Sequence, residues 1–73
     1  MRMEISEVIK KIRIELQLSQ TEFAYAVHVS FSTVNRWENN KAIPNRIARV
    51  IIIDLCEKMS VPIDLIDVMR TFK

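Results

Sequence analysis

Apolar residues recur along the chain at steps of three and four, which is the spacing of one face of an α-helix. The first stripe predicts a helix from about Glu4 to Leu16. Later stripes predict four further helices, at about 20–27, 31–38, 45–59 and from Ser60 and Pro62 onward. The β-branched run at 50–53 lies inside the fourth helical pattern, so no strand is predicted. The sequence therefore predicts an all-α protein with one domain over residues 1–73.

Short polar side chains stand where three of these helices should begin. Ser19 is followed three residues later by Glu22, the signature of a capping box. Ser30 and Asn45 are N-cap candidates for the third and fourth helices. The loop between those two helices is marked by turn-forming and polar residues, namely Asn39, Asn40, Lys41 and Pro44.

The same spacing assigns the side chains expected in the core. From the first helix to the fifth they are Ile5, Val8, Ile9, Ile12 and Leu16; Phe23, Ala24 and Val27; Val34 and Trp37; Ile47, Ile51, Ile52, Leu55 and Met59; and Ile63, Ile66 and Met69. Cys56, on a helix rich in aliphatic residues, is expected to be a small buried hydrophobe. Trp37 could stack on a base, but its spacing from Val34 favours the core.

Composition narrows the class of protein. The chain has 73 residues, of which 49% are hydrophobic, enough for a small core and too many for a disordered tail. One cysteine excludes an intramolecular disulfide and a cysteine metal cluster. No apolar run approaches the roughly 18–20 residues of a membrane span, and the N-terminus lacks the apolar core of a signal peptide. We therefore expect a cytoplasmic protein without a cofactor, a metal or membrane contact.

The distribution of charge is more informative than the net charge of +2. Between Phe23 and Ile53 the only acidic residue is Glu38, whereas four bases occur there: Arg36, Lys41, Arg46 and Arg49. A locally positive middle suits an anionic partner. No paired-carboxylate pocket, nucleophile–base set or phosphate loop is present, so catalysis is not predicted.

The segment from about Ile9 to Ile66 resembles the DNA-binding domain of the phage repressor and Cro family, the XRE-like regulators. The matching stretch reads IRIELQLSQTEFAYAVHVSFSTVNRWENNKAIP, and its matching positions are Arg13, Ser19-Gln20, Phe23-Ala24, Val29-Ser30, Val34, Trp37-Glu38 and Pro44. The resemblance implies a compact five-helix bundle whose second and third helices form a helix-turn-helix. The third helix would enter the major groove of double-stranded DNA.

The resemblance also implies which side chains contact DNA. On the third helix, positions 32, 35 and 36 share the face opposite Val34 and Trp37. The expected base contacts are Phe31, Ser32, Asn35 and Arg36, with amide and guanidinium groups suited to base edges in the major groove. The expected contacts to the DNA backbone are Gln20, Thr33, Asn39, Asn40 and Lys41. The alternative is that this face is merely solvated.

The chain contains no glycine, although the family often has glycine at four of its turns. Those positions are occupied here by Gln17, His28, Asn40 and Ser60. Glycine is favoured there because the chain turns through positive φ at helix C-termini. We expect the turns to form nonetheless, at a cost of roughly 1 kcal/mol for each strained site. His28 could instead be a metal ligand, but no second histidine supports it.

Two further interactions are expected. By the family resemblance, Arg13 and Glu38 should form an ion pair that ties the first helix to the end of the third. Apolar residues beyond those needed for the core predict a homodimer, with an interface formed by Val50, Ile53, Val68 and Phe72. The alternative is a protein-interaction module, such as an antitoxin, that uses the aliphatic surface of the fourth and fifth helices to bind a partner protein.

Overall fold

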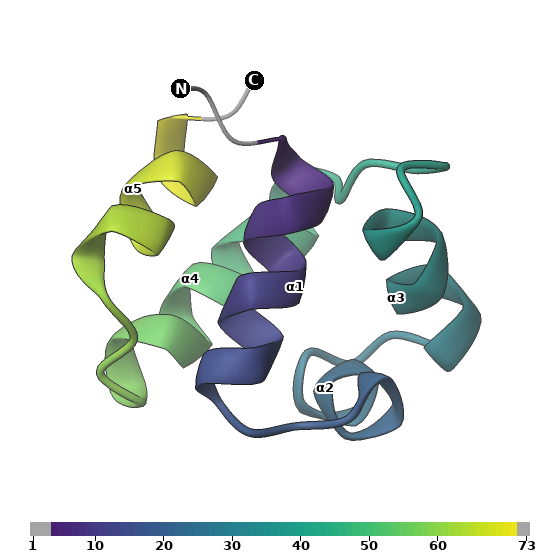
Figure 1. Cartoon of the computed structure of the whole chain (residues 1–73), viewed down its shortest axis with the longest axis horizontal. Coiled ribbons are helices and arrows are strands. Elements are labelled where there is room, and N and C mark those ends of the chain that lie inside the picture. The colour runs from purple at the N-terminus through teal and green to yellow at the C-terminus, as the bar shows by residue number, and fades with distance from the viewer. Residues whose placement is uncertain (1–3, 72–73) are drawn as a thin grey trace.

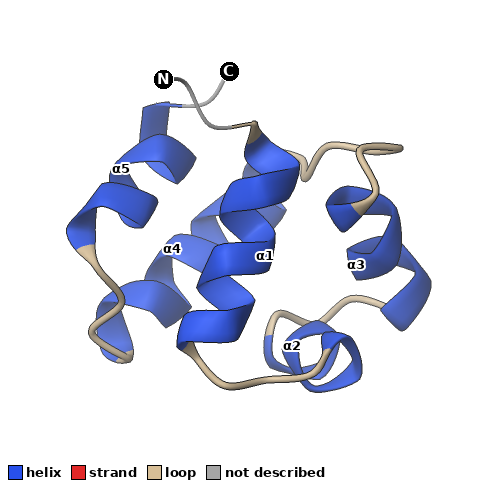
Figure 2. Cartoon of the chain, in the orientation of Figure 1, coloured by secondary structure: helices blue, strands red, loops and turns tan. Residues whose placement is uncertain are grey.

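The computed structural model describes residues 4–71, and all of the regular structure in that range is helical (Figure 2). The helices are α1 (Ile5–Glu15), α2 (Gln20–Ala26), α3 (Phe31–Glu38), α4 (Arg46–Lys58) and α5 (Ile63–Thr71). The all-α, five-helix prediction is therefore confirmed. The fifth helix begins one residue after Pro62, whose carbonyl accepts hydrogen bonds from the N–H groups of Leu65 and Ile66 at 3.1 and 3.4 Å.

The predicted N-caps are formed by the expected side chains. Ser19 Oγ accepts from the Glu22 N–H at 3.1 Å, and the Glu22 carboxylate accepts from the Ser19 N–H at 2.8 Å, which completes the capping box. These bonds to Ser19 lower the pKa of Glu22. At α3 and α4 the cap is a single hydrogen bond: Ser30 Oγ accepts from the Thr33 N–H, and Asn45 Oδ1 accepts from the Ala48 N–H. Each cap satisfies an N–H that has no partner within its helix.

In four helices, the residue two positions after the last helical residue has a positive φ angle, and none of these four residues is glycine. The φ angles are 58° at Gln17, 63° at His28, 59° at Asn40 and 58° at Ser60. The first three turns are Schellman motifs. After α2, for example, the Val29 N–H bonds to the Ala24 carbonyl at 3.0 Å and the His28 N–H to the Tyr25 carbonyl at 3.3 Å. The turns thus form at all four positions predicted from the glycine pattern.

Helix α1 lies at the centre of the view in Figure 1, with α2 and α3 on one side and α5 on the other, and α4 passes behind it. It packs directly against α3 and α5, while α2 packs against α3 and α4 against α5. The α1 side chains Val8, Ile9 and Ile12 are completely buried. Burial of each such side chain contributes about 1.5–3 kcal/mol, so the α1 stripe is a large part of the core of this small domain.

Three residues expected in the core lie at the surface. Ile47 is 72% exposed, Met59 58% and Ile63 60%. Helix α4 instead faces the core through residues spaced four apart, namely Ala48, Ile52 and Cys56. Because of the apolar run at 50–53, the sequence of α4 does not indicate a single apolar face. The prediction that Ile47 lies in the core was wrong for this reason, whereas the prediction for Ile52 was right.

Cys56 is completely buried, and burial raises the pKa of its thiol to about 11. Because the thiolate is the reactive form, we expect Cys56 to be unreactive toward Ellman's reagent at pH 8 in the native protein. In guanidinium chloride, one thiol per chain should react rapidly, since the chain has one cysteine. Rapid reaction of the native protein would show that the core around Cys56 opens readily.

No helix within residues 4–71 is both long enough and apolar enough to cross a membrane.

Candidate nucleic-acid interface

The segment from α2 to α3 has the geometry of a helix-turn-helix. Helix α2 packs against α3, and the chain reverses between them through His28 in its left-handed conformation (Figure 1). Val27 before the turn is buried and Val29 after it is half-buried, so both anchor the turn to the core. On α3, Val34 and Trp37 are buried. The opposite face of α3 therefore points away from the bundle.

The residues predicted to contact bases lie on that outer face. Phe31 is 50% exposed although it is a large apolar side chain, and Ser32 and Arg36 are exposed. Asn35 is less exposed than these residues: it is half-buried and lies at the edge of the face nearest α2. The helix thus presents an apolar ring, a hydroxyl, an amide and a guanidinium within six residues. These groups can address methyl, acceptor and donor positions on base edges.

The residues predicted to contact the DNA backbone do not all share one environment. Gln20 is half-buried at the start of α2, whereas Asn39, Asn40 and Lys41 are exposed just after α3. Thr33 is half-buried on a different side of α3 and its hydroxyl lies 2.9 Å from Ser30 Oγ. Thr33 thus belongs to a cluster of three hydroxyl groups at the start of α3, formed by Ser30, Ser32 and Thr33.

Arg13 and Glu38 are brought together from α1 and the end of α3. Arg13 Nε donates to Glu38 Oε2 at 2.7 Å and Arg13 Nη2 donates to Oε1 at 3.0 Å, a bidentate pair. Arg13 Nη1 also donates to the Leu18 carbonyl at 3.0 Å. The hydrogen bond to Glu38 raises the pKa of Arg13. The pair is largely shielded from water, with side-chain exposures of 16% and 4%.

Three side-chain amides extend this ion pair toward the outer face of α3. Gln20 Nε2 donates to Glu38 Oε1 at 3.1 Å, and Asn35 Nδ2 donates to Gln20 Oε1 at 3.2 Å. Asn39 Nδ2 donates to Asn35 Oδ1 at 3.1 Å. Sequence reasoning did not find these contacts. The linked side chains lie on α2 (Gln20), on α3 (Asn35 and Glu38) and at the C-cap of α3 (Asn39). The spacing of residues in the sequence does not show how α2 packs against α3, so it could not predict these contacts.

The ion pair also changes the local balance of charge. Glu38 is the only acidic residue between Phe23 and Ile53, and Arg13 neutralises it. Arg36, Lys41 and Arg46 are exposed, and among residues 4–71 no carboxylate lies within ion-pair distance of them. The surface around α3 and the following loop is therefore positively charged, which suits an anionic partner.

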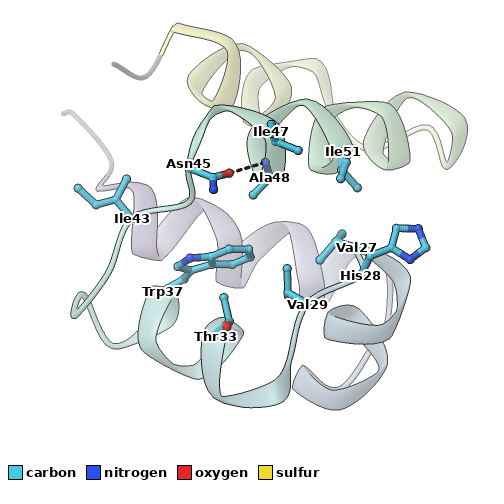
Figure 3. Close-up of a pocket in the computed structure, with 10 residues that line it drawn as sticks. All are labelled: Val27, His28, Val29, Thr33, Trp37, Ile43, Asn45, Ile47, Ala48 and Ile51. Atoms are coloured by element: carbon cyan, nitrogen blue, oxygen red, sulfur yellow. Dashed lines mark hydrogen bonds between the residues drawn. The ribbon is translucent and has the colours of Figure 1, made fainter.

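An apolar groove of about 360 Å³ lies between α4 and the α2–α3 turn. Ile47 and Ile51 of α4 form one wall, and Val27, Val29, Thr33 and Trp37 face them (Figure 3). The His28 ring points away from the groove (Figure 3). Within residues 4–71, no three His, Cys, Asp or Glu side chains gather where they could hold a metal ion.

The residues predicted to form a dimer interface differ in exposure. Val50 on α4 is 58% exposed. Ile53 on α4 and Val68 on α5 are half-buried and pack against the core with part of their surface. Phe72 lies outside the described residues. Of the three residues that are described, Val50 is therefore the most available for contact with another molecule.

The chain was compared with protein families, curated proteins and solved structures. A family model described as helix-turn-helix matches residues 9–66, which span all of α2, α3 and α4 and parts of α1 and α5. No curated protein matches the chain. No solved structure matches it either.

Proposed function

Since the chain belongs to the helix-turn-helix family of Cro/XRE-like DNA-binding regulators, we propose that it binds one double-stranded DNA sequence and represses transcription there. The observation that carries this proposal is the outer face of α3. An exposed aromatic ring, hydroxyl and guanidinium share that face, and the neighbouring loop adds uncompensated positive charge. An α-helix of this kind fits the major groove, where each base pair shows a distinct donor, acceptor and methyl pattern.

Roles follow from side-chain chemistry. Arg36 pairs with the O6 and N7 atoms of a guanine, and Asn35 addresses an adenine. Phe31 contacts a thymine methyl group, and Ser32 bonds to a neighbouring base edge. The proposed contacts to the DNA backbone, which fix the position of the domain without reading sequence, are Gln20, Thr33, Asn39, Asn40 and Lys41.

We further propose that two copies bind a palindromic operator. One recognition helix reads only a few base pairs, and a twofold-symmetric dimer doubles that number. The proposed contact between copies uses Val50, Ile53, Val68 and Phe72. In this geometry the two half-sites lie about 10 base pairs apart, centre to centre.

A selection from random DNA duplexes tests the proposal. Purified protein is mixed with the pool at moderate salt, and the retained duplexes are sequenced. We expect an enriched palindrome whose half-site spacing is about one helical turn. A single enriched half-site would refute the dimer and keep the DNA-reading function. No enrichment by a folded protein would refute the proposed function.

Two substitutions separate base reading from backbone binding. Arg36→Ala should reduce the preference at one base pair by about 1–3 kcal/mol, because the variant lacks the bidentate donors. Lys41→Ala should weaken binding to all sequences alike and lower the salt slope of log K by about 0.9. Binding isotherms on the selected site and on variants of it, at several salt concentrations, measure both effects. If Arg36→Ala and Lys41→Ala both weaken binding to all sequences alike, α3 is not the helix that reads the bases.

The exposed apolar residues favour a second candidate function, the binding of a partner protein. Ile43, Ile47 and Ile51 line the groove beside the helix-turn-helix, and the first two are strongly exposed. Contiguous exposed apolar surface commonly marks an interface. Binding through this surface would be nearly insensitive to salt, whereas binding through phosphates weakens steeply as salt rises.

A further inference from the structure

The hydrogen bonds that link α1, α2 and α3 all run in one direction. Asn39 donates to Asn35, Asn35 donates to Gln20, and Gln20 donates to Glu38. Glu38 also accepts two of the three hydrogen bonds that the Arg13 guanidinium donates. We call Gln20, Asn35 and Asn39 the amide relay. It begins at a buried carboxylate and ends on the surface that we propose to face DNA.

The carboxylate determines the orientation of the first amide. An ionised carboxylate has no hydrogen to donate, so only the NH₂ end of the Gln20 amide can face Glu38. Both Glu38 oxygens accept from the Arg13 guanidinium in a bidentate pair, and the Glu38 side chain is 4% exposed, so Glu38 presents acceptor oxygens in this site. Turning the Gln20 amide over would place two acceptor oxygens against each other in a poorly solvated site. The Gln20 oxygen is therefore directed toward Asn35.

The orientation of the Gln20 amide in turn determines the orientation of the Asn35 amide. Because the Gln20 oxygen can only accept, Asn35 must present its NH₂ group to it, and the bond is 3.2 Å long. The Asn35 oxygen then lies on the other side, where Asn39 Nδ2 donates to it at 3.1 Å and also to the Asn35 backbone carbonyl at 2.8 Å. One hydrogen on Asn35 Nδ2 and one lone pair on Asn35 Oδ1 remain unused.

We propose that Glu38, acting through Gln20, sets which end of the Asn35 amide donates and which accepts when the protein reads DNA. This inference rests on the proposed function. An asparagine amide that is free to rotate can place either its NH₂ group or its oxygen at a given point in the major groove. It can therefore pair with either of two base edges whose donor and acceptor positions are reversed. A fixed amide suits one of them. Glu38 and Gln20 are thus positioning residues for base recognition, whether or not either touches a base.

The substitution Gln20→Lys isolates the relay. The lysine ammonium keeps a donor for Glu38 and keeps a group that attracts phosphate, but it offers Asn35 no acceptor. The base pair that Asn35 reads is first identified as the one whose preference is lost in Asn35→Ala. We expect Gln20→Lys to reduce the preference at that same base pair about tenfold. The preference is the ratio of the affinities of one variant for two sequences, so a change in its overall affinity for DNA cancels.

Thr21→Lys is the matched control, since Thr21 is exposed on α2 and lies outside the relay. It should strengthen binding to all sequences and leave the preference unchanged. If Gln20→Lys keeps the wild-type preference at the base pair that Asn35 reads, the inference is wrong. An equal loss in both lysine variants would also overturn it, because added charge alone would then explain the loss.

A measurement without DNA tests the geometry separately. In the free protein, the ¹⁵N-detected NH₂ signals of Asn35 should be shifted from those of a solvated amide, and Gln20→Lys should return them toward solvated values. Unchanged Asn35 signals would overturn the relay even if DNA binding is selective. If the relay signals are as expected but the wild-type protein selects no sequence, the proposed function fails and the role of the relay in recognition fails with it.

Discussion

Arg13→Met should destabilise the fold by about 3–5 kcal/mol, because it leaves a buried carboxylate without its partner. Glu38 has a side-chain exposure of 4%, and Arg13 makes two of the three side-chain hydrogen bonds that it accepts. A domain of this length is stable by only about 4–11 kcal/mol. The loss is therefore a large part of the total, and chemical denaturation followed by circular dichroism measures it directly.

An exposed ion pair provides the control for Arg13→Met. Lys58 and Asp54 form a pair on α4 with side-chain exposures of 72% and 62%. Lys58→Met should change stability by less than about 1 kcal/mol, since such pairs contribute little. The double variant Arg13→Met/Glu38→Leu should recover part of the loss, because it removes the unpaired charge. If Arg13→Met and Lys58→Met cost the same, the Arg13–Glu38 pair does not support the fold.

Introducing glycine at the four helix ends should have a large effect of opposite sign. Gln17, His28, Asn40 and Ser60 all have φ between 58° and 63°, a conformation in which a Cβ atom is strained. Removing the Cβ should stabilise the fold by about 0.5–1 kcal/mol per site, after the entropy of glycine in the unfolded chain is subtracted. All four together should raise Tm by on the order of 10–30 °C.

A glycine in a helical conformation is the matched control for the four-glycine variant. Lys11 is exposed within α1, and Lys11→Gly should destabilise the protein by about 1 kcal/mol. Thermal unfolding followed by circular dichroism compares the two variants. A fall in Tm for the four-glycine protein would mean that the present side chains make contacts worth more than the strain they cause.

These helix ends were predictable because their chemistry is local. Ser19 with Glu22, and Ser30 and Asn45 at their helices, were identified as caps from residue type and spacing alone. The positive φ angles at the four turns were expected from the family resemblance, because the family often has glycine at those positions. A helix cap depends on side chains that lie within a few residues of one another, so the local sequence is enough to predict it.

Properties that depend on several helices were less accessible. Apolar residues occur almost all around α4. Hydrophobicity predicted that Cys56 is buried, but it did not show that Ala48 faces the core while Ile47 faces solvent. The orientation of the Asn35 amide depends on Gln20, 15 positions away, and on a carboxylate at the far end of α3. The sequence could thus suggest residues for the candidate interface, but it could not reveal the contacts that orient them.

The packing of α1 against α5 has a consequence for the synthesis of the protein. The buried stripe of α1 emerges from the ribosome first, and α5, which contributes Ile66 and Met69 to the core, follows roughly fifty residues later. At about 5–20 residues per second, that delay is on the order of 3–10 seconds. During this time the apolar face of α1 lacks one of its partners, so the nascent chain reaches its final core only after α5 has been made.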